Sequence, residues 1–267
     1  MNLFQKAMDL ELSNTSFAMI TLLESKGSTP RNQARMIVDQ HGKTYGTIGG
    51  GPAEAATIED ALIAIQNGDS TEKTYTLNKE QEGGLNMQCG GNMRIFIDVI
   101  LGKQQLILIG GGHVNLEVAW MADRLGYNVV VVDDRPGYTT PERFPMASNL
   151  YVAETMKEAI EACPLADDVA VVIATKDDDL TGLREVLKKT DGKYVGVIGS
   201  KRKIHKINQQ LLEEQVAKER LEAVYGPIGL NIGAETPAEI ALSILSELTA
   251  VLGHQDGKSM REGRHAI

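Results

Sequence analysis

Three consecutive glycines, Gly110, Gly111 and Gly112, followed by His113, have the spacing that most clearly indicates chemistry in this chain. They stand where the apolar run 106–109 meets a helical pattern. Glycines at such a strand-to-helix turn let the backbone approach a phosphate, which the exposed N–H groups and the helix dipole then hold. We therefore expect an anion site at this turn; the alternative is a tight turn that binds nothing.

The next predicted strand, residues 129–133, ends in Asp133, at about the spacing at which dinucleotide folds place an acid for a ribose hydroxyl. The third glycine of the fingerprint is missing, because Asn115 stands there. A larger residue at that position is expected to push the helix and strand apart slightly. The turn thus predicts an anion ligand and disfavours tight NAD binding.

A second glycine triplet, Gly49, Gly50 and Gly51, opens a predicted helix, and Pro52 suits its first turn. Successive glycines can aim several N–H groups into one concavity that binds an anion. A close-packed turn is the equal alternative.

A third candidate is the loop that contains Cys89, Gly90 and Gly91. A cysteine beside two glycines is accessible, which suits a thiolate ligand or a sulfur carrier. A lone cysteine is more often structural, and that is how we interpret Cys163, which precedes Pro164 at a helix end.

A fourth candidate is the run Ser200, Lys201, Arg202 and Lys203, which lies between the predicted strand 194–198 and the predicted helix 204–215, where a first helical turn could form. Cations in the first turn of a helix oppose its dipole, so a bound phosphate would explain them; a solvated basic surface is the alternative. The five histidines have no zinc spacing, and we predict neither a metal site nor a nucleophile elbow nor a P-loop.

The elements that position these residues differ between the two parts of the chain. Residues 1–102 predict a small α+β domain, 103–254 a Rossmann-like doubly wound parallel sheet, and 255–267 a flexible tail. The predicted strands of the first part are 17–23, 34–38, 44–48, 73–77 and 94–100, with helices over 2–12 and from 51 to about 67. The second part alternates strands 106–109, 129–133, 150–152, 169–174 and 194–198 with helices 116–125, 155–162, 180–188, 204–215 and one from 236 to about 253.

The composition narrows the class of protein. The chain has 267 residues and a formal net charge of −9, which argues against nucleic-acid binding. Two cysteines exclude a disulfide framework and fit a reducing cytosol. No apolar run approaches the roughly 20 residues needed to span a bilayer, and the first residues do not form a secretory signal. We expect a cytoplasmic protein that binds neither nucleic acid nor membrane.

Taken in order, seven motifs resemble one family. They are Gly27-Ser-Thr-Pro-Arg31, Gly46-Thr-Ile-Gly-Gly-Gly51, Cys89-Gly-Gly91, Gly110-Gly-Gly-His113, Asp133-Asp-Arg135, Gly196-Val-Ile-Gly-Ser-Lys-Arg202 and Pro227-Ile-Gly-Leu-Asn-Ile-Gly-Ala-Glu-Thr-Pro237. The chain resembles the xanthine dehydrogenase accessory proteins of the XdhC/CoxI type. Each motif is weak by itself, but their order over most of the chain is specific.

The resemblance implies an assembly factor for a molybdenum hydroxylase of the xanthine dehydrogenase type, and not the dehydrogenase itself. Such a factor binds molybdenum cofactor, assists its sulfuration with a cysteine desulfurase and delivers it to the apo-enzyme. It is expected to be a homodimer. The phosphate of the cofactor would be held by the helix starts and Lys201–Lys203, with Arg135 also in the site, and the metal end would lie near Cys89.

Two departures qualify the resemblance. The family commonly has cysteine where Pro52 stands, which leaves Cys89 as the sole thiol candidate and puts two-cysteine chemistry in doubt. Asn115 stands where the family often has glycine. Two alternatives therefore stay open: an NAD(P)-binding oxidoreductase, and a nucleotide-regulated scaffold that docks the hydroxylase and the desulfurase.

Overall fold

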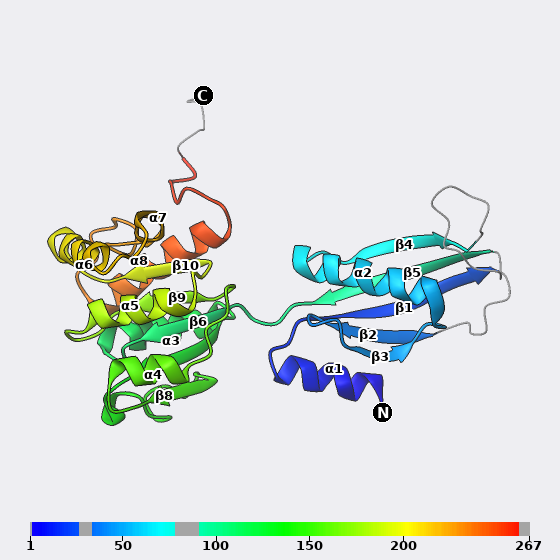
Figure 1. The fold of residues 1–267 in the computed structure, drawn as a ribbon, viewed down its shortest axis with the longest axis horizontal. Coiled ribbons are helices and arrows are strands. Elements are labelled where there is room, and N and C mark those ends of the chain that lie inside the picture. The colour runs from blue at the N-terminus through cyan, green and yellow to red at the C-terminus, as the bar shows by residue number, and fades with distance from the viewer. Residues whose placement is uncertain (1, 27–33, 78–90, 262–267) are drawn as a thin grey trace. The chain divides into compact units, whose positions relative to one another are not determined.

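A computed structural model describes residues 2–26, 34–77 and 91–261. The chain divides into two compact units, Met1–Gly102 and Lys103–Ile267 (Figure 1). Residues 262–267 of the predicted tail lie outside the described residues.

The first unit is built on an antiparallel sheet in the order β3-β2-β1-β5-β4. Its strands are β1 (Phe17–Lys26), β2 (Arg35–Asp39), β3 (Thr44–Thr47), β4 (Thr71–Thr76) and β5 (Asn92–Ile100). Side chains alternate along β1, so Ala18 and Ile20 enter the core under α2 (Gly51–Asn67), whereas Phe17 packs with α1 (Leu3–Leu12). The two helices thus lie on opposite faces of the sheet.

The second unit is built on a parallel sheet in the order β10-β9-β6-β7-β8. Its strands are β6 (Gln105–Ile109), β7 (Asn128–Asp133), β8 (Asn149–Val152), β9 (Ala170–Ile173) and β10 (Tyr194–Val197). Its helices are α3 (His113–Arg124), α4 (Met156–Ala162), α5 (Asp179–Lys189), α6 (Lys201–Glu213), α7 (Lys218–Glu222) and α8 (Pro237–Leu252), with a 3-10 turn at Pro136–Tyr138. The buried cores on the two faces of the sheet contain residues of α3 and α8 on one side and of α4, α5 and α6 on the other.

The order of these strands locates a ligand site. β6 comes first along the chain in this unit, with β7 on one side and β9 on the other, so the strand order reverses between β6 and β9. Ligands of open α/β sheets bind outside the carboxyl ends of the strands at such a reversal. This is the arrangement of a doubly wound Rossmann sheet, and the predicted fold class is confirmed.

The predicted elements differ from the observed ones mainly at helix starts. The helices expected from residues 116 and 204 begin at His113 and Lys201, because Gly112 and Ser200 are their N-caps. The last predicted helix, from residue 236, is α8, which Thr236 and Glu239 close with a capping box, and α7 was not predicted.

Candidate functional site

The turn between β6 and α3 requires glycine at its first two positions. Gly110 has φ +102°, and a Cβ there would lie 2.4 Å from the carbonyl oxygen of Ala174 at the end of β9. A Cβ on Gly111 would lie 2.4 Å from the carbonyl oxygen of Tyr138. Backbone from two neighbouring segments therefore closes on these glycines.

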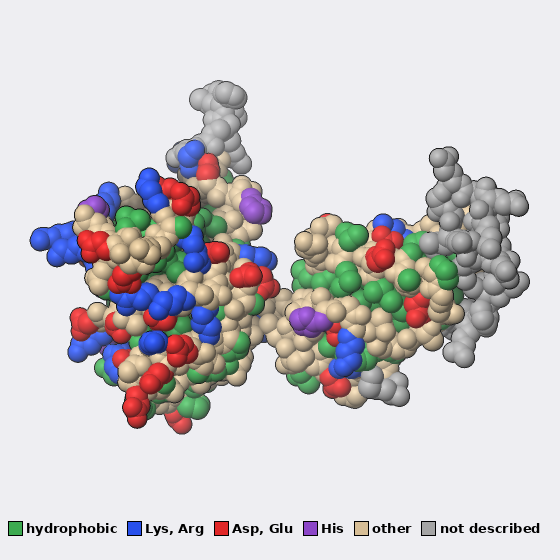
Figure 2. All heavy atoms as spheres, viewed as in Figure 1, with side chains coloured by type: hydrophobic (Ala, Val, Ile, Leu, Met, Phe, Trp, Pro, Cys, Tyr) green, Lys and Arg blue, Asp and Glu red, His purple; other side chains and the backbone are tan. Residues whose placement is uncertain are grey.

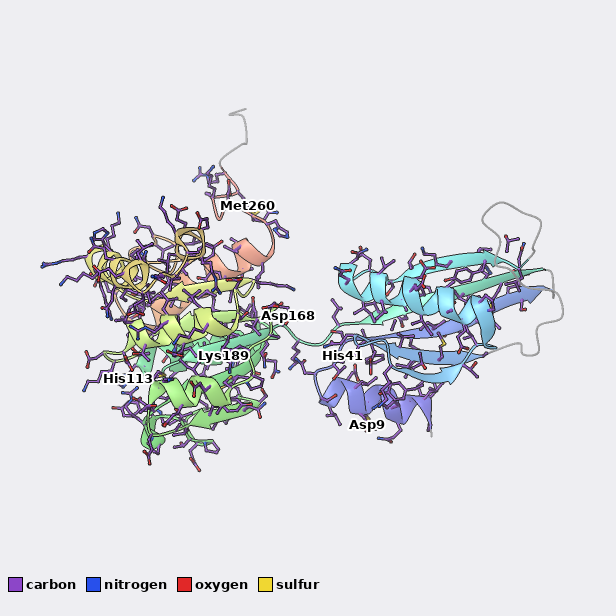
Figure 3. All side chains as sticks on the ribbon, in the orientation of Figure 1. Asp9, His41, His113, Asp168, Lys189 and Met260 are labelled. Carbon is purple, nitrogen blue, oxygen red and sulfur yellow. The ribbon has the colours of Figure 1, made fainter. Side chains whose placement is uncertain are left out.

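Gly112 has a different environment. It is the N-cap of α3 with φ −72°, a value open to any residue, and a Cβ there would meet nothing nearer than 3.9 Å. No side chain caps this helix, and the N–H groups of His113 and Val114 have no partner among the residues that the structure describes. His113 is exposed (Figure 3). The start of α3 thus offers unpaired donors beside free space, which is what an anion requires.

The side chain of Asn115 forms hydrogen bonds as well as occupying space. It is fully buried, and its Nδ2 donates hydrogen bonds to the carbonyl oxygens of Ile109 (3.1 Å) and Gly110 (2.7 Å). The side chain therefore ties the first turn of α3 to the end of β6. From the sequence we expected a residue larger than glycine only to push the helix and the strand apart. The two hydrogen bonds of Asn115 were not predicted.

The carboxylate of Asp133 is engaged by the chain itself. It is fully buried; Oδ2 accepts from the N–H of Gly111, and Oδ1 accepts from the N–H and Nε of Arg135, both at 2.8 Å. Burial by itself raises the pKa of Asp133, but the hydrogen bonds from Arg135 and Gly111 outweigh it and lower that pKa. Asp133 thus holds the turn and Arg135 in place and does not present a free acceptor to a ribose.

The segment after β7 lies across the same turn. The guanidinium of Arg143 donates to the carbonyl oxygens of Gly111 (3.2 Å) and Tyr138 (3.3 Å). The Tyr138 ring faces two cations, with the guanidinium carbon of Arg135 at 4.0 Å and that of Arg143 at 5.4 Å from its centroid. Thr139 is 5% exposed, and its hydroxyl has no partner among the described residues. This hydroxyl would lie 2.9 Å from a Cβ on Gly111, so an unsatisfied polar group borders the turn.

The predicted basic cluster divides into two kinds of residue. Ser200 caps α6 by accepting from the N–H of Lys203 (3.2 Å), and the ammonium of Lys203 is paired with the buried carboxylate of Asp179. Lys201 and Arg202 are exposed, and Figure 2 shows cationic side chains gathered over α6. Lys203 therefore neutralises an internal charge, whereas Lys201 and Arg202 face solvent.

Asp179 is a site residue that the sequence reasoning missed. Its Oδ1 accepts from the N–H (2.8 Å) and hydroxyl (2.6 Å) of Thr175, which directly follows β9. Together with Lys203 it joins the β9 and β10 ends of the site. An acid in the first turn of a helix was the available signal, but the pairing depends on residues far apart in sequence.

The glycine triplet of the first unit contains a carboxylate from its own helix. Gly49, Gly50 and Gly51 all have positive φ, and Glu54 Oε2 accepts from the N–H groups of Ile48 and Gly50, each at 3.0 Å. Glu54 also accepts from the hydroxyl of Thr47 at 2.5 Å. Burial raises the pKa of Glu54, but these hydrogen bonds prevail and lower it. The turn does bind an anion, and that anion is the side chain of Glu54.

The cysteine loop cannot be placed in the same detail. Cys89 and Gly90 lie outside the described residues, whereas Gly91 is described and its carbonyl accepts from the N–H of Leu77 (2.8 Å). Cys163 is buried, and burial raises its pKa to about 11, so its thiol stays protonated near neutral pH.

The structure therefore brings part of the predicted site together. Gly110–Gly112, His113, Asp133 and Arg135 form one site in the second unit, and Ser200–Lys203 follow β10 at the same sheet edge. The other predicted residues, 49–51 and 91, belong to the first unit. In the part of the chain that the structure describes, no three potential ligands cluster as a metal site would require, and no helix is long and apolar enough to cross a membrane.

Two known proteins resemble this chain over 99% and 58% of its length. The uncharacterized protein YqeB of Escherichia coli is 37% identical over 265 residues, 99% of this chain and 49% of YqeB. A probable xanthine dehydrogenase subunit from Bacillus subtilis is 35% identical over 156 residues, 58% of this chain and 44% of that protein. The chain thus spans about half the length of these two relatives.

Two further similarities extend the comparison. The molybdenum cofactor insertion chaperone PaoD of Escherichia coli is 24% identical over 95% of this chain and 89% of PaoD. The crystal structure of a xanthine dehydrogenase from Bacillus halodurans covers 97% of this chain with a TM-score of 0.50 and 19% identity, which supports the fold. Residues 106–248 match the XdhC Rossmann domain, and residues 11–76 match the XdhC and CoxI family. The chain belongs to the XdhC and CoxI family.

Proposed function

We propose that this chain is an accessory factor for a molybdenum hydroxylase, which binds molybdenum cofactor and assists its insertion into the apo-enzyme. The similarity to a molybdenum cofactor insertion chaperone supports the reaction class, and the similarity to a probable xanthine dehydrogenase subunit supports the client class. The observation that carries the ligand assignment is the uncapped start of α3 beside Gly112.

The residues at this start fit a phosphate-bearing ligand. The N–H groups of His113 and Val114, which have no partner in the described part of the chain, can donate to phosphate oxygens, and Gly112 lets those oxygens approach the backbone. The unpartnered hydroxyl of Thr139 borders the same turn. When bound, molybdenum cofactor supplies the hydroxylase chemistry through its metal end, so this chain needs only to hold and protect it.

The other predicted contacts take narrower roles in this proposal. Asp133 and Arg135 position the turn, because the carboxylate is already paired. Lys201 and Arg202 add positive potential at the sheet edge, whereas Lys203 is paired with Asp179. A nucleotide phosphate would meet the same donors on α3, so pterin and metal content distinguish the cofactor from a nucleotide.

Sulfuration is a further part of the proposal. A cysteine desulfurase would supply sulfur, and Cys89 is the candidate thiol that contacts the sulfur or the metal. Gly49–Gly51 can serve as a binding site for an external anion only if that anion displaces the Glu54 carboxylate. We also propose that the chain forms a homodimer.

The decisive experiment measures retention of molybdenum cofactor by Gly112→Ala. A methyl group at this position leaves the fold intact but fills the space that a phosphate needs, so retained pterin and molybdenum should fall severalfold. Gly137→Ala is the matched control, because a Cβ there meets nothing within 4 Å, whereas one on Gly112 meets nothing nearer than 3.9 Å. Retention is read as pterin fluorescence and metal content after gel filtration.

Four results would contradict the proposal. The wild-type chain could fail to retain the cofactor, or Gly112→Ala and Gly137→Ala could retain it equally, which would remove the site assignment. A titration that shows sub-millimolar binding of NAD(H) or NADP(H) in place of the cofactor would favour the oxidoreductase. Capture of the apo-hydroxylase from cofactor-free cells, without cofactor binding, would favour the scaffold.

A further inference from the structure

Helix α1 has apolar side chains on two of its faces. Leu3, Ala7 and Leu10 face the sheet and pack in one cluster with Phe17 and Ile37. This is the amphipathic spacing expected of a helix that covers a sheet. The fold of the first unit accounts for this inner face completely.

The outer face of α1 carries a second apolar row. Phe4, Met8 and Leu12 are 59%, 50% and 81% exposed. They follow one another at i, i+4 and i+8, so they form a single ridge roughly 12 Å long at 1.5 Å per residue. Single exposed apolar residues are ordinary, but a continuous ridge marks an interaction surface.

Beside this outer ridge, positive charge lies at the amino end of α1 and negative charge at its carboxyl end. At its amino end, the guanidinium of Arg35 lies over the Phe4 ring, 5.7 Å from the centroid. At its carboxyl end stand Asp9 and Glu11, with no basic residue in the last turn. Acidic groups there are unfavourable against the helix dipole, and the last turn of α1 contains no cation to compensate them.

We propose that the outer ridge binds the same ridge of a second copy of this chain, with the two α1 helices antiparallel about Met8. Phe4 then packs against the partner's Leu12, and Arg35 meets the partner's Glu11. The charge division is what favours a second copy, because a ridge that is cationic at one end and acidic at the other complements itself only when reversed. Such an interface is closed and isologous.

This interface specifies the self-association in the proposed function and needs no bound cofactor. The test is sedimentation velocity of the full chain over a concentration series. The wild-type chain should be a dimer, and Leu12→Lys should raise the dissociation constant at least about tenfold, the equivalent of 1.4 kcal/mol. Leu242→Lys, at a leucine of α8 that is 52% exposed, is the matched control and should leave it unchanged.

Charge exchange keeps the proposal falsifiable even if Leu12→Lys disturbs α1. Glu11→Arg and Arg35→Glu should each weaken the dimer, and the double variant should restore it. A monomeric wild-type chain, equal effects of Leu12→Lys and Leu242→Lys, or no recovery in the double variant would overturn the interface. Cofactor retention by Leu12→Lys is a separate readout: it should persist, so failure of the interface and failure of the cofactor site are distinguishable.

Discussion

The two glycine turns of this chain, before α2 and before α3, look alike in sequence. They differ in which backbone groups of the turn are bound by a side chain of the following helix. In the first unit, Glu54 of α2 reaches back and accepts from the N–H groups of Ile48 and Gly50. In the second, Asn115 of α3 reaches back and donates to the carbonyl oxygens of Ile109 and Gly110. One helix therefore occupies the donors of its turn, whereas the other occupies the acceptors.

The consequence is opposite for ligands. A carboxylate already fills the turn before α2, so an external anion must compete with it. The amide side chain in the first turn of α3 satisfies carbonyl groups and leaves the helix N–H groups unpaired among the described residues. A glycine triplet thus marks an anion site only when no side chain of its own helix takes the donors.

The largest expected effect comes from adding a methyl group to each turn. Gly110→Ala combines a positive φ with a backbone contact at 2.4 Å and should cost the second unit about 3 kcal/mol or more. Gly50→Ala has the strain but open space, so it should cost the first unit about 1 kcal/mol. Denaturant unfolding followed by Trp120, the single tryptophan, measures the second unit, and hydrogen exchange measures the first.

Gly137→Ala serves as the control in the second unit and should change the free energy of unfolding by less than about 0.5 kcal/mol. If Gly110→Ala and Gly137→Ala unfold at the same denaturant concentration, close contact with neighbouring backbone is not the reason that the turn before α3 requires glycine at position 110.

A smaller effect is expected at Asn115. Asn115→Ala removes both hydrogen bonds. The Ile109 carbonyl keeps its bond from the Ala174 N–H, whereas the buried Gly110 carbonyl loses the Asn115 donor, so the change should cost about 2 kcal/mol. Asn115→Asp is isosteric but also lacks the donors and adds a buried charge, so it should cost more than Asn115→Ala. The unfolding transition of Trp120 reports both variants. Equal stability of wild type and Asn115→Asp would show that the bonds do not hold the turn.

The sequence predicted most of the scaffold because its signals are local. Runs such as 106–109 and 129–132 are apolar throughout and lie in strands buried on both faces. The last predicted helix begins at Thr236, which caps α8. The missed helix starts at His113 and Lys201 have a local cause too, since an N-cap precedes the apolar periodicity by several residues.

The site was less predictable because its partners are distant in sequence or specific in orientation. Lys203 stands in a basic run, yet it pairs with Asp179, 24 residues earlier in the chain. Asp133 has the spacing of a ribose acceptor, yet Arg135 and Gly111 already occupy its oxygens. Residue type and spacing indicate what a side chain can bind, whereas the fold decides whether that capacity is already used.

The smallest expected effect tests the occupied turn. Glu54→Gln keeps one acceptor oxygen but removes the charge from the bonds with Ile48 and Gly50, and should destabilise the first unit by about 1 kcal/mol at neutral pH. Because the pKa of Glu54 is lowered from 4.5 in the folded state, the unfolded chain binds this proton more readily. The contribution is therefore fully present above the unfolded pKa and is lost as the pH falls through the folded pKa. Hydrogen exchange of β1 and β5 should show the difference between wild type and Glu54→Gln shrinking on acidification. A difference that stays constant below pH 4.5 would mean that the amide groups of this turn do not depend on the carboxylate, and that the two turns are more alike than their hydrogen bonds indicate.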